Sequence, residues 1–435
     1  MPTHDELFDR ASRYLPGGVS AAARARVALG RPLYIARGDG AKLYDVEGNE
    51  YLDLSTSHGA SLLGHNHPRI GEAVQKALDM GTICSMDTEH HGALAEKICE
   101  LVPCMEMVRF AGSGTETTMH CIRAAREHTG KKVIVKFEGH FHGIHDYLQY
   151  NWPSTNVERT PGRPGSLRCE SGGVPDAMGQ FVIVLPFNDR EVLTHVFAER
   201  ANEIAAVILE PIAYNDGCIL PRPGYLELLR EECTKHGVVL IFDEILSGFR
   251  TGTDCAQGHL GVTPDLCTLG KSLGGGAPIS AFGGRRDIMQ VVSPLGASSH
   301  SGTYNGHLYQ VLPALAALKE YSQPGFYDNI HALAGKLYDG TNALFERSKL
   351  KARLQGVGAR FGLFFGIEGE VWDGAGASKN DRALVGKFRD ACFRRGIYMD
   401  TNGHAGFSSK HTPADIDRVL SVFADAVGEV EKEIS

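Results

Sequence analysis

The chain has 435 residues, of which 43% are hydrophobic and 22% are charged, a composition typical of a folded globular protein with room for two or three domains. Its formal net charge of −8 argues against nucleic acid or an anionic membrane as the main partner and favours small molecules. No apolar stretch approaches the ~20 residues that span a bilayer, and the first ten residues are polar and acidic, unlike a signal peptide. We therefore expect a cytoplasmic protein.

The ten cysteines form no Cys-x-x-Cys pair. In a chain of this length they are interpreted as reduced, mostly buried thiols that pack as small hydrophobic side chains. We expect neither a zinc site nor a disulfide framework.

The first 30 residues predict an amphipathic helix that breaks at Pro16-Gly17-Gly18 and is followed by an arginine-containing arm. Arg24 in this arm is a candidate ligand for a substrate carboxylate, since a guanidinium group matches a carboxylate with two parallel hydrogen bonds. A solvated surface arginine is an equally good interpretation of this residue taken alone. Residues 41–54 alternate around Glu47-Gly48-Asn49 and predict a hairpin in a small terminal domain.

From Gly64 onward the pattern changes to helices that alternate with short apolar strands. This alternation is typical of a parallel α/β layer fold. The predicted strands are 107–110, 133–137, 181–185, 206–209, 238–242 and 266–269. From about residue 321 the chain predicts a second, smaller α+β domain that contains a strand at 362–367.

The first of these strands leads into the sequence AGSGTETTMHCIRAAR. Ser113 and Glu116 form a capping-box pattern at the start of a helix. The N–H groups of the first helical turn and the hydroxyls of Ser113 and Thr115 suit a phosphate group. The same pattern also begins many helices that bind no ligand.

The second strand leads into EGHFHGIHD, with His140, His142 and His145. The His-x-His spacing is found in metal sites, but no carboxylate or cysteine at a fitting interval completes a ligand shell, so we expect no metal. Phe141 is a candidate stacking surface for a flat ligand, with core packing as the alternative. Residues 149–178 are rich in Pro, Gly, Ser and Arg and predict a long loop over the sheet face.

The most informative stretch is 238–276. Its first strand ends in Asp243 and Glu244, and ligands of open α/β sheets bind at the carboxyl ends of strands. Its second strand ends in Gly270-Lys271-Ser272, where glycines leave room for a planar ligand and partial desolvation favours a nucleophilic lysine amine. Glu210 and Asn215 follow another strand and are expected near the same crevice.

A nucleotide triphosphatase is a rival interpretation of this stretch, because an Asp-Glu strand end and a Gly-Lys-Ser sequence both occur in such enzymes. The glycine that a phosphate-binding loop requires is replaced by Asp265, and Gly-Lys-Ser follows the Asp-Glu strand instead of preceding it. We reject this interpretation.

Nearly the whole chain resembles the class III, fold type I, pyridoxal-phosphate-dependent aminotransferases. The resemblance rests on IFDEILSGFR followed by PDLCTLGKSLGGG, and on AGSGTETTMHCIRAAR and KFEGHFHG. Together with SGTYNGH, these stretches are most similar to the glutamate-1-semialdehyde aminomutase branch. The resemblance implies a large cofactor-binding domain at 61–320 with a mostly parallel seven-stranded sheet. It also implies an N-terminal arm that forms part of a small domain at 1–60, and the rest of that small domain at 321–435.

The resemblance also implies roles for individual residues. Lys271 would form a Schiff base with pyridoxal 5'-phosphate and move a proton, and Asp243 would pair with the pyridine nitrogen. The other cofactor-binding residues would be Ser113, Gly114, Thr115, Phe141, His142, Glu210, Asn215 and Ile245, with Thr303 reaching the phosphate from the neighbouring subunit of a homodimer. Among these, Phe141 and Ile245 would sandwich the ring.

The chain departs from the aminomutase pattern on the substrate side. Ala21 replaces a hydroxyl residue near Arg24, and His58 stands where the aminomutases carry a tryptophan. The loop 151–178 also lacks their gating sequence. We therefore expect Arg24 and His58 to contact an altered substrate.

These departures predict ping-pong transamination from a small amine or amino acid, including β-amino acids, to a 2-oxo acid. The alternative is intramolecular transfer by a glutamate-1-semialdehyde 2,1-aminomutase. A binding protein without catalysis is disfavoured, because both Lys271 and Asp243 are retained.

Overall fold

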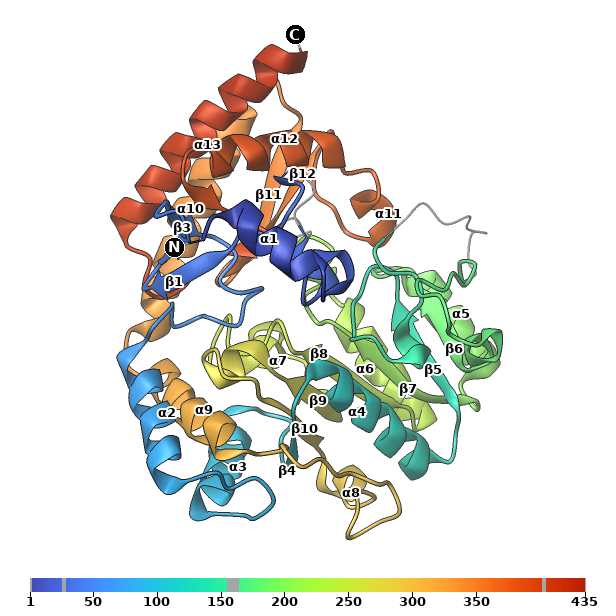
Figure 1. Ribbon diagram of the computed structural model, residues 1–435. Helices are drawn as coiled ribbons and strands as arrows, with labels where there is room; N and C mark the ends of the chain where they lie inside the picture. Colours follow the sequence, from blue (N-terminus) through green and yellow to red (C-terminus); the bar gives the residue numbers. More distant parts are fainter. Residues whose placement is uncertain (1, 26–28, 155–163, 401–403, 435) are drawn as a thin grey trace. The chain divides into compact units, whose positions relative to one another are not determined.

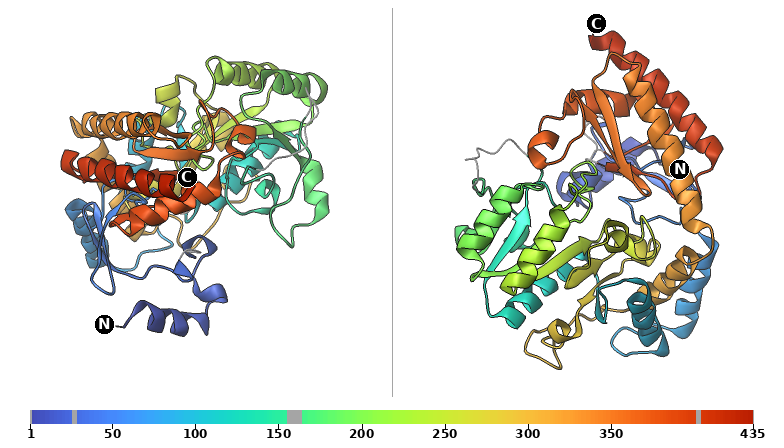
Figure 2. Two further views of the ribbon diagram at one scale, coloured as in Figure 1. Left: turned by 90° about the horizontal axis from the view of Figure 1, so that it is seen from above. Right: turned by 180° about the vertical axis from the view of Figure 1, so that it is seen from behind.

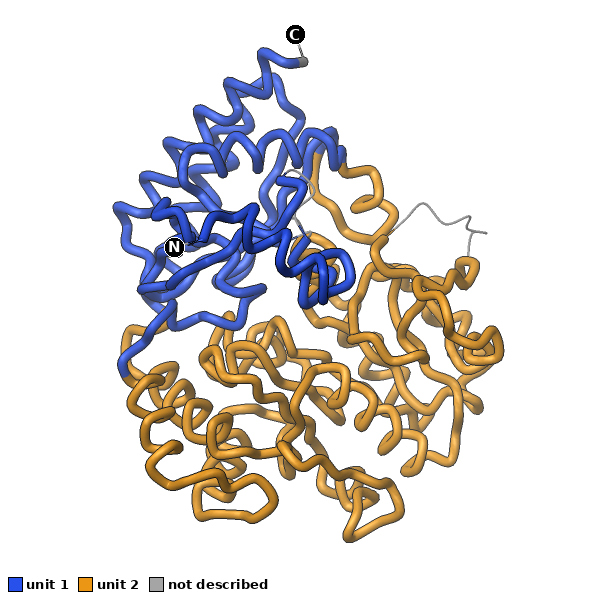
Figure 3. Tube along the Cα trace, in the orientation of Figure 1, with its two compact units in different colours: residues 1–68, 328–368, 381–435 blue, residues 69–327, 369–380 orange. Residues whose placement is uncertain are grey.

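The computed structural model describes residues 2–25, 29–154, 164–400 and 404–434. The chain divides into two compact units (Figure 3). Unit 1 comprises residues 1–68, 328–368 and 381–435, and unit 2 comprises residues 69–327 and 369–380. The segment 369–380, which the sequence analysis assigned to the C-terminal domain, packs with unit 2 instead. The predicted long loop at 149–178 lies partly outside the described residues, because 155–163 are not described.

Unit 2 contains the seven-stranded sheet (Figures 1 and 2). In spatial order its strands are β4 (Met107–Ala111), β10 (Ser280–Gly284), β9 (Leu266–Leu269), β8 (Val239–Glu244), β7 (Ile204–Leu209), β5 (Val133–Phe137) and β6 (Val182–Leu185). Neighbours from β9 to β6 run parallel, while β10 is antiparallel to both β4 and β9. The mostly parallel sheet expected from the sequence is confirmed.

Six of the strands were predicted from apolar runs, but β10 was not. Its sequence is Ser-Ala-Phe-Gly-Gly, which is too rich in small residues to give a strand signal. Small residues are required here, because a Cβ atom on Gly283 would lie 2.1 Å from the carbonyl oxygen of Met107 on β4. Close approach of neighbouring strands therefore replaces side-chain packing at this position.

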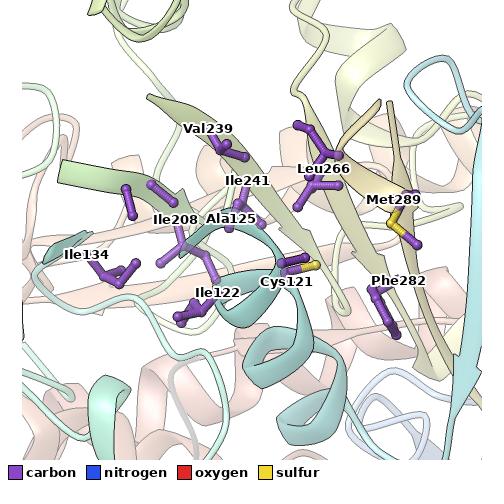
Figure 4. Packing of buried hydrophobic residues seen from close by; sticks show 14 of the residues in the cluster. Cys121, Ile122, Ala125, Ile134, Ile208, Val239, Ile241, Leu266, Phe282 and Met289 are labelled. Carbon is purple, nitrogen blue, oxygen red and sulfur yellow. The ribbon is translucent and has the colours of Figure 1, made fainter. Parts of the chain in front are cut away.

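Helices cover both faces of the sheet in unit 2, with α4 (Gly114–Thr129) on one face and α5 (Arg190–Arg200) and α6 (Tyr225–His236) on the other (Figures 1 and 2). Residues of α4 such as Ile122 and Ala125 pack on buried sheet residues such as Ile208 (Figure 4). Burial of the sheet on both faces explains why its central strands are continuous apolar runs. The other helices of this part of the chain are α2 (Pro68–Met80), α3 (Glu89–Leu101), α7 (Cys255–Leu260), α8 (Arg286–Met289), α9 (Leu308–Tyr321) and α11 (Gly374–Ala377).

Unit 1 contains two small sheets. One has the order β1 (Ile35–Asp39), β2 (Lys42–Asp45), β3 (Glu50–Asp53) and β13 (Ile397–Tyr398), and the other has β11 (Ala352–Val357), β12 (Arg360–Phe365) and β14 (His404–Gly406). The predicted hairpin is formed by β2 and β3, which pair antiparallel. On its other side, β3 pairs in parallel with β13. This pairing brings residues near position 400 beside residues near position 55.

The helices of unit 1 are α1 (His4–Ser12), α10 (Phe326–Glu346), α12 (Arg382–Phe393) and α13 (Pro413–Ile434). The α10 and α13 helices lie side by side (Figure 2), and the Nζ atom of Lys336 lies 2.7 Å from a carboxylate oxygen of Asp417 between them. The break predicted after the first helix is present, since Gly17 and Gly18 have φ angles of 65° and 70°.

None of the helices within the described ranges has the length and apolar character needed to cross a membrane. In the same ranges, no group of three or more His, Cys, Asp or Glu side chains is arranged to hold a metal ion.

Candidate active site

A cavity of about 250 Å³ lies in unit 2, at the edge of the sheet where the parallel strands β5, β7, β8 and β9 have their carboxyl ends. Its lining brings together residues that are up to 166 positions apart in the sequence. They are Gly114, Thr115, Phe141, His142, Gly143, Glu210, Asn215, Asp243, Ile245, Leu246, Lys271 and Ser280. Most of the predicted cofactor-binding residues therefore line one cavity.

One side of the cavity is formed by the first turn of α4. The hydroxyl of Ser113 accepts a hydrogen bond from the backbone N–H of Glu116 at 3.3 Å, and the Glu116 carboxylate accepts hydrogen bonds from the N–H groups of Gly112 and Ser113 at 2.7 and 3.1 Å. The predicted capping box is thus present. The positive end of the helix dipole and the first-turn N–H groups make this wall suitable for an anionic group.

A second segment packs closely on this helix end. Gly143 has a φ of 89°, and a Cβ atom there would lie 2.6 Å from the hydroxyl oxygen of Thr115. The hydroxyl of Thr118 donates to the carbonyl oxygen of His142 at 2.8 Å. Only glycine at position 143 permits this approach, which holds the segment after β5 against the anion-binding turn.

Asp243 provides a buried carboxylate at the end of β8. One of its oxygens lies 2.8 Å from Nδ1 of His142, and the other accepts hydrogen bonds from the hydroxyl of Thr268 at 3.0 Å and the N–H of Ile245 at 3.1 Å. Burial lowers the pKa of His142 despite the attraction of Asp243, which favours a neutral ring that donates its Nδ1–H to the carboxylate. The carboxylate is therefore held in one orientation by three donors.

Glu210 is the second buried carboxyl group of the cavity, at the end of β7. It accepts hydrogen bonds from the N–H of Phe141 at 2.8 Å and from the side-chain amide of Asn215 at 3.0 Å. Its own N–H donates to Nδ1 of His140 at 3.0 Å. Burial and the nearby Asp243 raise the pKa of Glu210. Its contacts orient the Phe141 backbone and the Asn215 amide.

Phe141 and Ile245 are the apolar members of the lining. The Phe141 ring packs on the Trp152 ring at a centroid distance of 4.4 Å. Ile245 fills the space beside two glycines, since a Cβ atom on Gly270 would lie 2.9 Å from Ile245 Cδ1 and one on Gly114 would lie 3.2 Å from it. Their expected contact with two faces of a flat ring stays a prediction.

Lys271 lies two residues after the end of β9 and lines the cavity. Its φ of 45° is in the left-handed region, which residues with side chains rarely adopt. Such backbone strain is concentrated at functional sites, where it places a side chain that ordinary geometry would direct elsewhere. The amine thus shares a cavity with the carboxylate of Asp243 and the N-terminus of α4.

Some predicted residues lie elsewhere. Ser113 acts as the N-cap of α4 and does not line the cavity, and Thr303 is exposed and does not line it either. The contact expected of Thr303 involves a second subunit and stays a prediction. Arg24 and His58 line a separate pocket of unit 1, so their expected contact with the substrate also stays a prediction.

The cavity also contains residues that the sequence analysis missed, namely Gly143, Leu246 and Ser280. Gly143 carried a signal, because it completes the His-Phe-His-Gly turn. Ser280 belongs to β10 and had no signal, since its place depends on the antiparallel pairing of β10 with β4, in which it lies opposite Ala111.

Comparisons with known proteins show the family of the chain. Residues 23–403 match the family described as "Aminotransferase class-III". A glutamate-1-semialdehyde 2,1-aminomutase of Sorangium cellulosum (strain So ce56) is 42% identical over 98% of this chain and 96% of its own length.

Two solved structures are also similar. An omega-transaminase from Sphaerobacter thermophilus is 33% identical, with a TM-score of 0.93 and 98% of each chain covered. A β-phenylalanine aminotransferase from Variovorax paradoxus is 30% identical, with a TM-score of 0.86, 98% of this chain covered and 94% of the other.

The chemistry of the cavity fits pyridoxal 5'-phosphate. The α4 turn suits its phosphate, the buried carboxylate of Asp243 suits a protonated ring nitrogen, and the Lys271 amine suits its aldehyde. The Nε2 atom of His142 is buried and has no hydrogen-bond partner among the described residues, as expected for a site that a ligand completes. The chain therefore belongs to the class III aminotransferases, a family of enzymes that depend on pyridoxal 5'-phosphate.

Proposed function

We propose that the chain is a glutamate-1-semialdehyde 2,1-aminomutase, which moves an amino group between adjacent carbons of one substrate. The observation that carries this proposal is the 42% identity to the Sorangium aminomutase over nearly the full length of both chains. Further aminomutases of Nitrosomonas europaea and Nitrosospira multiformis are 40% and 41% identical. The relatives thus favour the aminomutase, which was the alternative prediction from the sequence, over the transaminase, which was the first prediction.

Several residues in and around the unit 2 cavity would each have a separate role in the reaction. Bound pyridoxal 5'-phosphate supplies an electron sink for negative charge that develops on the substrate carbon. The Asp243 carboxylate would hold a proton on the ring nitrogen, and His142 and Thr268 would keep that carboxylate in place. Asn215, oriented by Glu210, would donate a hydrogen bond to the ring hydroxyl.

Lys271 would have two roles. Its amine would bind the cofactor covalently, and after displacement by the substrate amine its Nζ atom would move a proton between substrate and cofactor carbons. The residue before it must be glycine, because a Cβ atom on Gly270 would lie 2.9 Å from both Ile245 Cδ1 and Ser280 Oγ. A residue that touches the reacting atoms in this way is the principal catalytic residue.

Arg24 is proposed to bind the substrate carboxylate. Its guanidinium group is exposed in the pocket of unit 1 and donates to the hydroxyl of Ser20. An exposed guanidinium that lines a pocket retains donors for a carboxylate. His58 lines the same pocket and is proposed to contact the rest of the substrate.

A transaminase with separate donor and acceptor is the second candidate. It is favoured by the similarity to two solved aminotransferases and by the polar His58 in place of an indole. A mutase must retain its intermediate until the amino group has moved, whereas a transaminase releases the first product. A pocket lined by His58 is more polar than one lined by an indole, and this favours release of the first product.

The enzyme is also proposed to act as a homodimer. Four apolar side chains among the described residues of unit 2 are unusually exposed, with relative accessibilities of 73% for Met86, 71% for Ile144, 66% for Leu295 and 65% for Tyr304. Exposed large apolar groups are typical of protein interfaces. Thr303, the expected contact to the partner's cofactor, is adjacent to Tyr304.

Two incubations distinguish the candidates. In the first, the purified holoenzyme receives glutamate-1-semialdehyde without any amino acceptor, and the proposal expects repeated turnover to 5-aminolevulinate. In the second, it receives an amino donor such as alanine or 3-aminobutanoate alone. Release of one equivalent of carbonyl product, with no 5-aminolevulinate in the first incubation, would establish the transaminase instead.

A further inference from the structure

Residues 299–306 of unit 2 form a loop that precedes α9 and exposes its middle. Gly302, Thr303 and Tyr304 are exposed, and the relative accessibility of Tyr304 is 65%. The N–H of Asn305 donates to the carbonyl oxygen of Gly302 at 3.0 Å, which closes a tight turn around Thr303 and Tyr304. The loop therefore presents a threonine hydroxyl on the surface of the unit.

The start of this loop is tied to the central part of unit 2. Nη1 of Arg123 on α4 donates to the carbonyl oxygen of Ser299 at 3.2 Å. Nε2 of His300 lies 3.0 Å from the carbonyl oxygen of Phe110 on β4. These two contacts fix the backbone where it enters the exposed turn.

The end of the loop is held by His91, from the first turn of α3. Nε2 of His91 lies 2.6 Å from the carbonyl oxygen of Gly306. Gly306 has a φ of 80°, and a Cβ atom there would lie 3.1 Å from Cδ2 of His91. The left-handed backbone favours glycine at this position, and the missing Cβ atom lets the imidazole ring approach the carbonyl group.

Both ring nitrogens of His91 are used. The backbone N–H of Thr88 donates to Nδ1 at 2.9 Å, and an N–H group can only donate, so the ring hydrogen lies on Nε2 and is donated to Gly306. In a capping box the third helical residue is usually Glu or Gln, which reaches back to the cap. His91 reaches back with one nitrogen and holds the loop with the other.

We propose that His91 is a positioning residue for the cofactor site of the partner subunit. Its Nε2–H holds the carbonyl group of Gly306, three residues after Thr303, so that the turn directs the Thr303 hydroxyl at the cofactor phosphate bound by a second copy of the chain. The inference rests on the proposed function, because it takes the enzyme to be a homodimer in which Thr303 completes the partner's site.

This role acts between subunits, and that sets it apart from ordinary packing. A change at His91 that displaces the turn weakens phosphate binding in the other chain of the dimer. A residue that only stabilises its own fold weakens the site of its own chain. The two cases are separated by a dimer in which a single chain keeps Lys271.

Two substitutions separate the helix cap from the loop contact. His91→Glu keeps an acceptor for the N–H of Thr88 and is the usual residue at this position of a capping box, but it has no donor for Gly306. His91→Gln keeps an acceptor and a donor. Both variants should keep the denaturant midpoint of the wild type, because both preserve the cap.

The test uses hybrid dimers, isolated by a different affinity tag on each chain. In the first hybrid one chain carries both Lys271→Ala and His91→Glu, and its partner is wild type. In the second hybrid one chain carries Lys271→Ala and the other His91→Glu. Each is stripped of cofactor and titrated with pyridoxal 5'-phosphate, and the occupied Lys271 is counted by borohydride reduction and peptide mass spectrometry.

The reference is a hybrid with Lys271→Ala in one chain and no other change. The first hybrid should bind the cofactor about tenfold more weakly than the reference, as expected for the loss of one hydrogen bond to phosphate. The second hybrid should match the reference, because its working site receives an unaltered loop. With His91→Gln in place of His91→Glu, the first hybrid should regain most of its affinity.

His90→Glu is the matched control. His90 precedes His91 in the same helical turn, its side chain is 14% exposed, and its Nε2 lies 3.9 Å from a carboxylate oxygen of Glu89. In the first hybrid, His90→Glu adds the same charge without removing the donor to Gly306, so the reference affinity should be kept.

Three results overturn the inference. The first is equal affinity in the two His91→Glu hybrids, and the second is a weakening confined to the hybrid with the altered residue on the Lys271 chain. The third is a weakening by His91→Gln or His90→Glu as large as that by His91→Glu, which assigns the effect to the ring or to charge and not to the donor.

The hybrids also separate this inference from the proposed function. Cofactor binding requires no substrate, so failure of 5-aminolevulinate formation would reject the aminomutase while the hybrids still test His91. Equal affinities in hybrids of an active aminomutase would reject only the role of His91. A chain that stays monomeric would reject the homodimer and this inference together.

Discussion

The carboxylate of Asp243 is the residue on which the chemistry of the unit 2 cavity depends most strongly. It receives hydrogen bonds from Thr268 and Ile245 and faces Nδ1 of His142, so its orientation is fixed by groups from three segments. Asp243→Asn keeps the shape but loses the negative charge opposite the ring nitrogen. We expect a loss of about a thousandfold or more in kcat, equivalent to about 4 kcal/mol of transition-state stabilisation.

The measurement is single-turnover kinetics on the variant loaded with cofactor. Cofactor content is determined in parallel, so that a loss of rate is not confused with a loss of binding. Turnover within a few fold of the wild type would remove Asp243 from the mechanism.

For single residues, the sequence predicted which side chains carry the chemistry better than it predicted which side chains contact one another. Lys271 and Asp243 were found because each follows an apolar strand, and strand ends meet at one edge of a parallel sheet. The pair of His58 and Asp400 was not found, because its members are 342 positions apart and meet only through the parallel pairing of β13 with β3. No local pattern encodes such a contact.

Among the elements, α4 links stability to ligand binding. Ser113 caps this helix with its hydroxyl, and the same first turn forms the proposed phosphate site. Ser113→Ala should lower the free energy of unfolding by about 1 kcal/mol and also weaken cofactor binding severalfold. Denaturant unfolding and titration with pyridoxal 5'-phosphate measure the two effects.

Asp189 provides the control for this prediction. It caps α5 by accepting a hydrogen bond from the N–H of Val192 at 3.0 Å, and it does not line the cavity. Asp189→Ala should cost similar stability without changing cofactor affinity. If both variants bind the cofactor equally well, the α4 turn is not the phosphate site.

The elements also show where sequence patterns stop being informative. Hydrophobic runs predicted the parallel strands well, because burial on both faces requires them. The left-handed turn at 56–58 had no such signal, since Thr-Ser-His contains neither glycine nor asparagine, and a left-handed residue costs roughly 1–2 kcal/mol. Two buried partners stabilise it, namely Asp53, which directly precedes the turn in β3, and Arg360, which is distant in sequence and lies in β12.

The stability of the whole molecule should depend on buried histidines at acidic pH. His120 is 7% exposed and stacks on Phe282 at a centroid distance of 5.2 Å, and burial lowers its pKa to about 4. Between pH 6.5 and 4 the unfolded chain binds a proton at this residue that the folded chain does not, so the free energy of unfolding falls as the pH falls.

His120→Phe should remove this dependence. Relative to the variant, the wild type should lose about 2–3 kcal/mol of stability as the pH falls from 6.5 to 4, and the difference should be constant above pH 7. Denaturant unfolding at several pH values measures it, with His195→Phe as a control for the substitution itself. A difference that does not vary with pH would contradict the assignment.

The organisation of the whole chain was predicted only in outline. The sequence indicated small-domain segments at both ends of a central α/β region, but the return of residues 369–380 to unit 2 had no sequence signal. That segment is held by contacts such as the hydrogen bond from the Asn188 side chain to the carbonyl oxygen of Trp372 at 2.6 Å. Long-range contacts of this kind are decided by packing, which a local pattern does not report.

The most direct measurement for the central claim, that the unit 2 cavity holds the cofactor on Lys271, is chemical trapping. The holoenzyme is reduced with borohydride, digested and analysed by peptide mass spectrometry. The visible absorbance of the bound cofactor should disappear, and a pyridoxyl adduct should map to Lys271. An adduct on another lysine, or no adduct in a protein that retains its cofactor, would contradict the account.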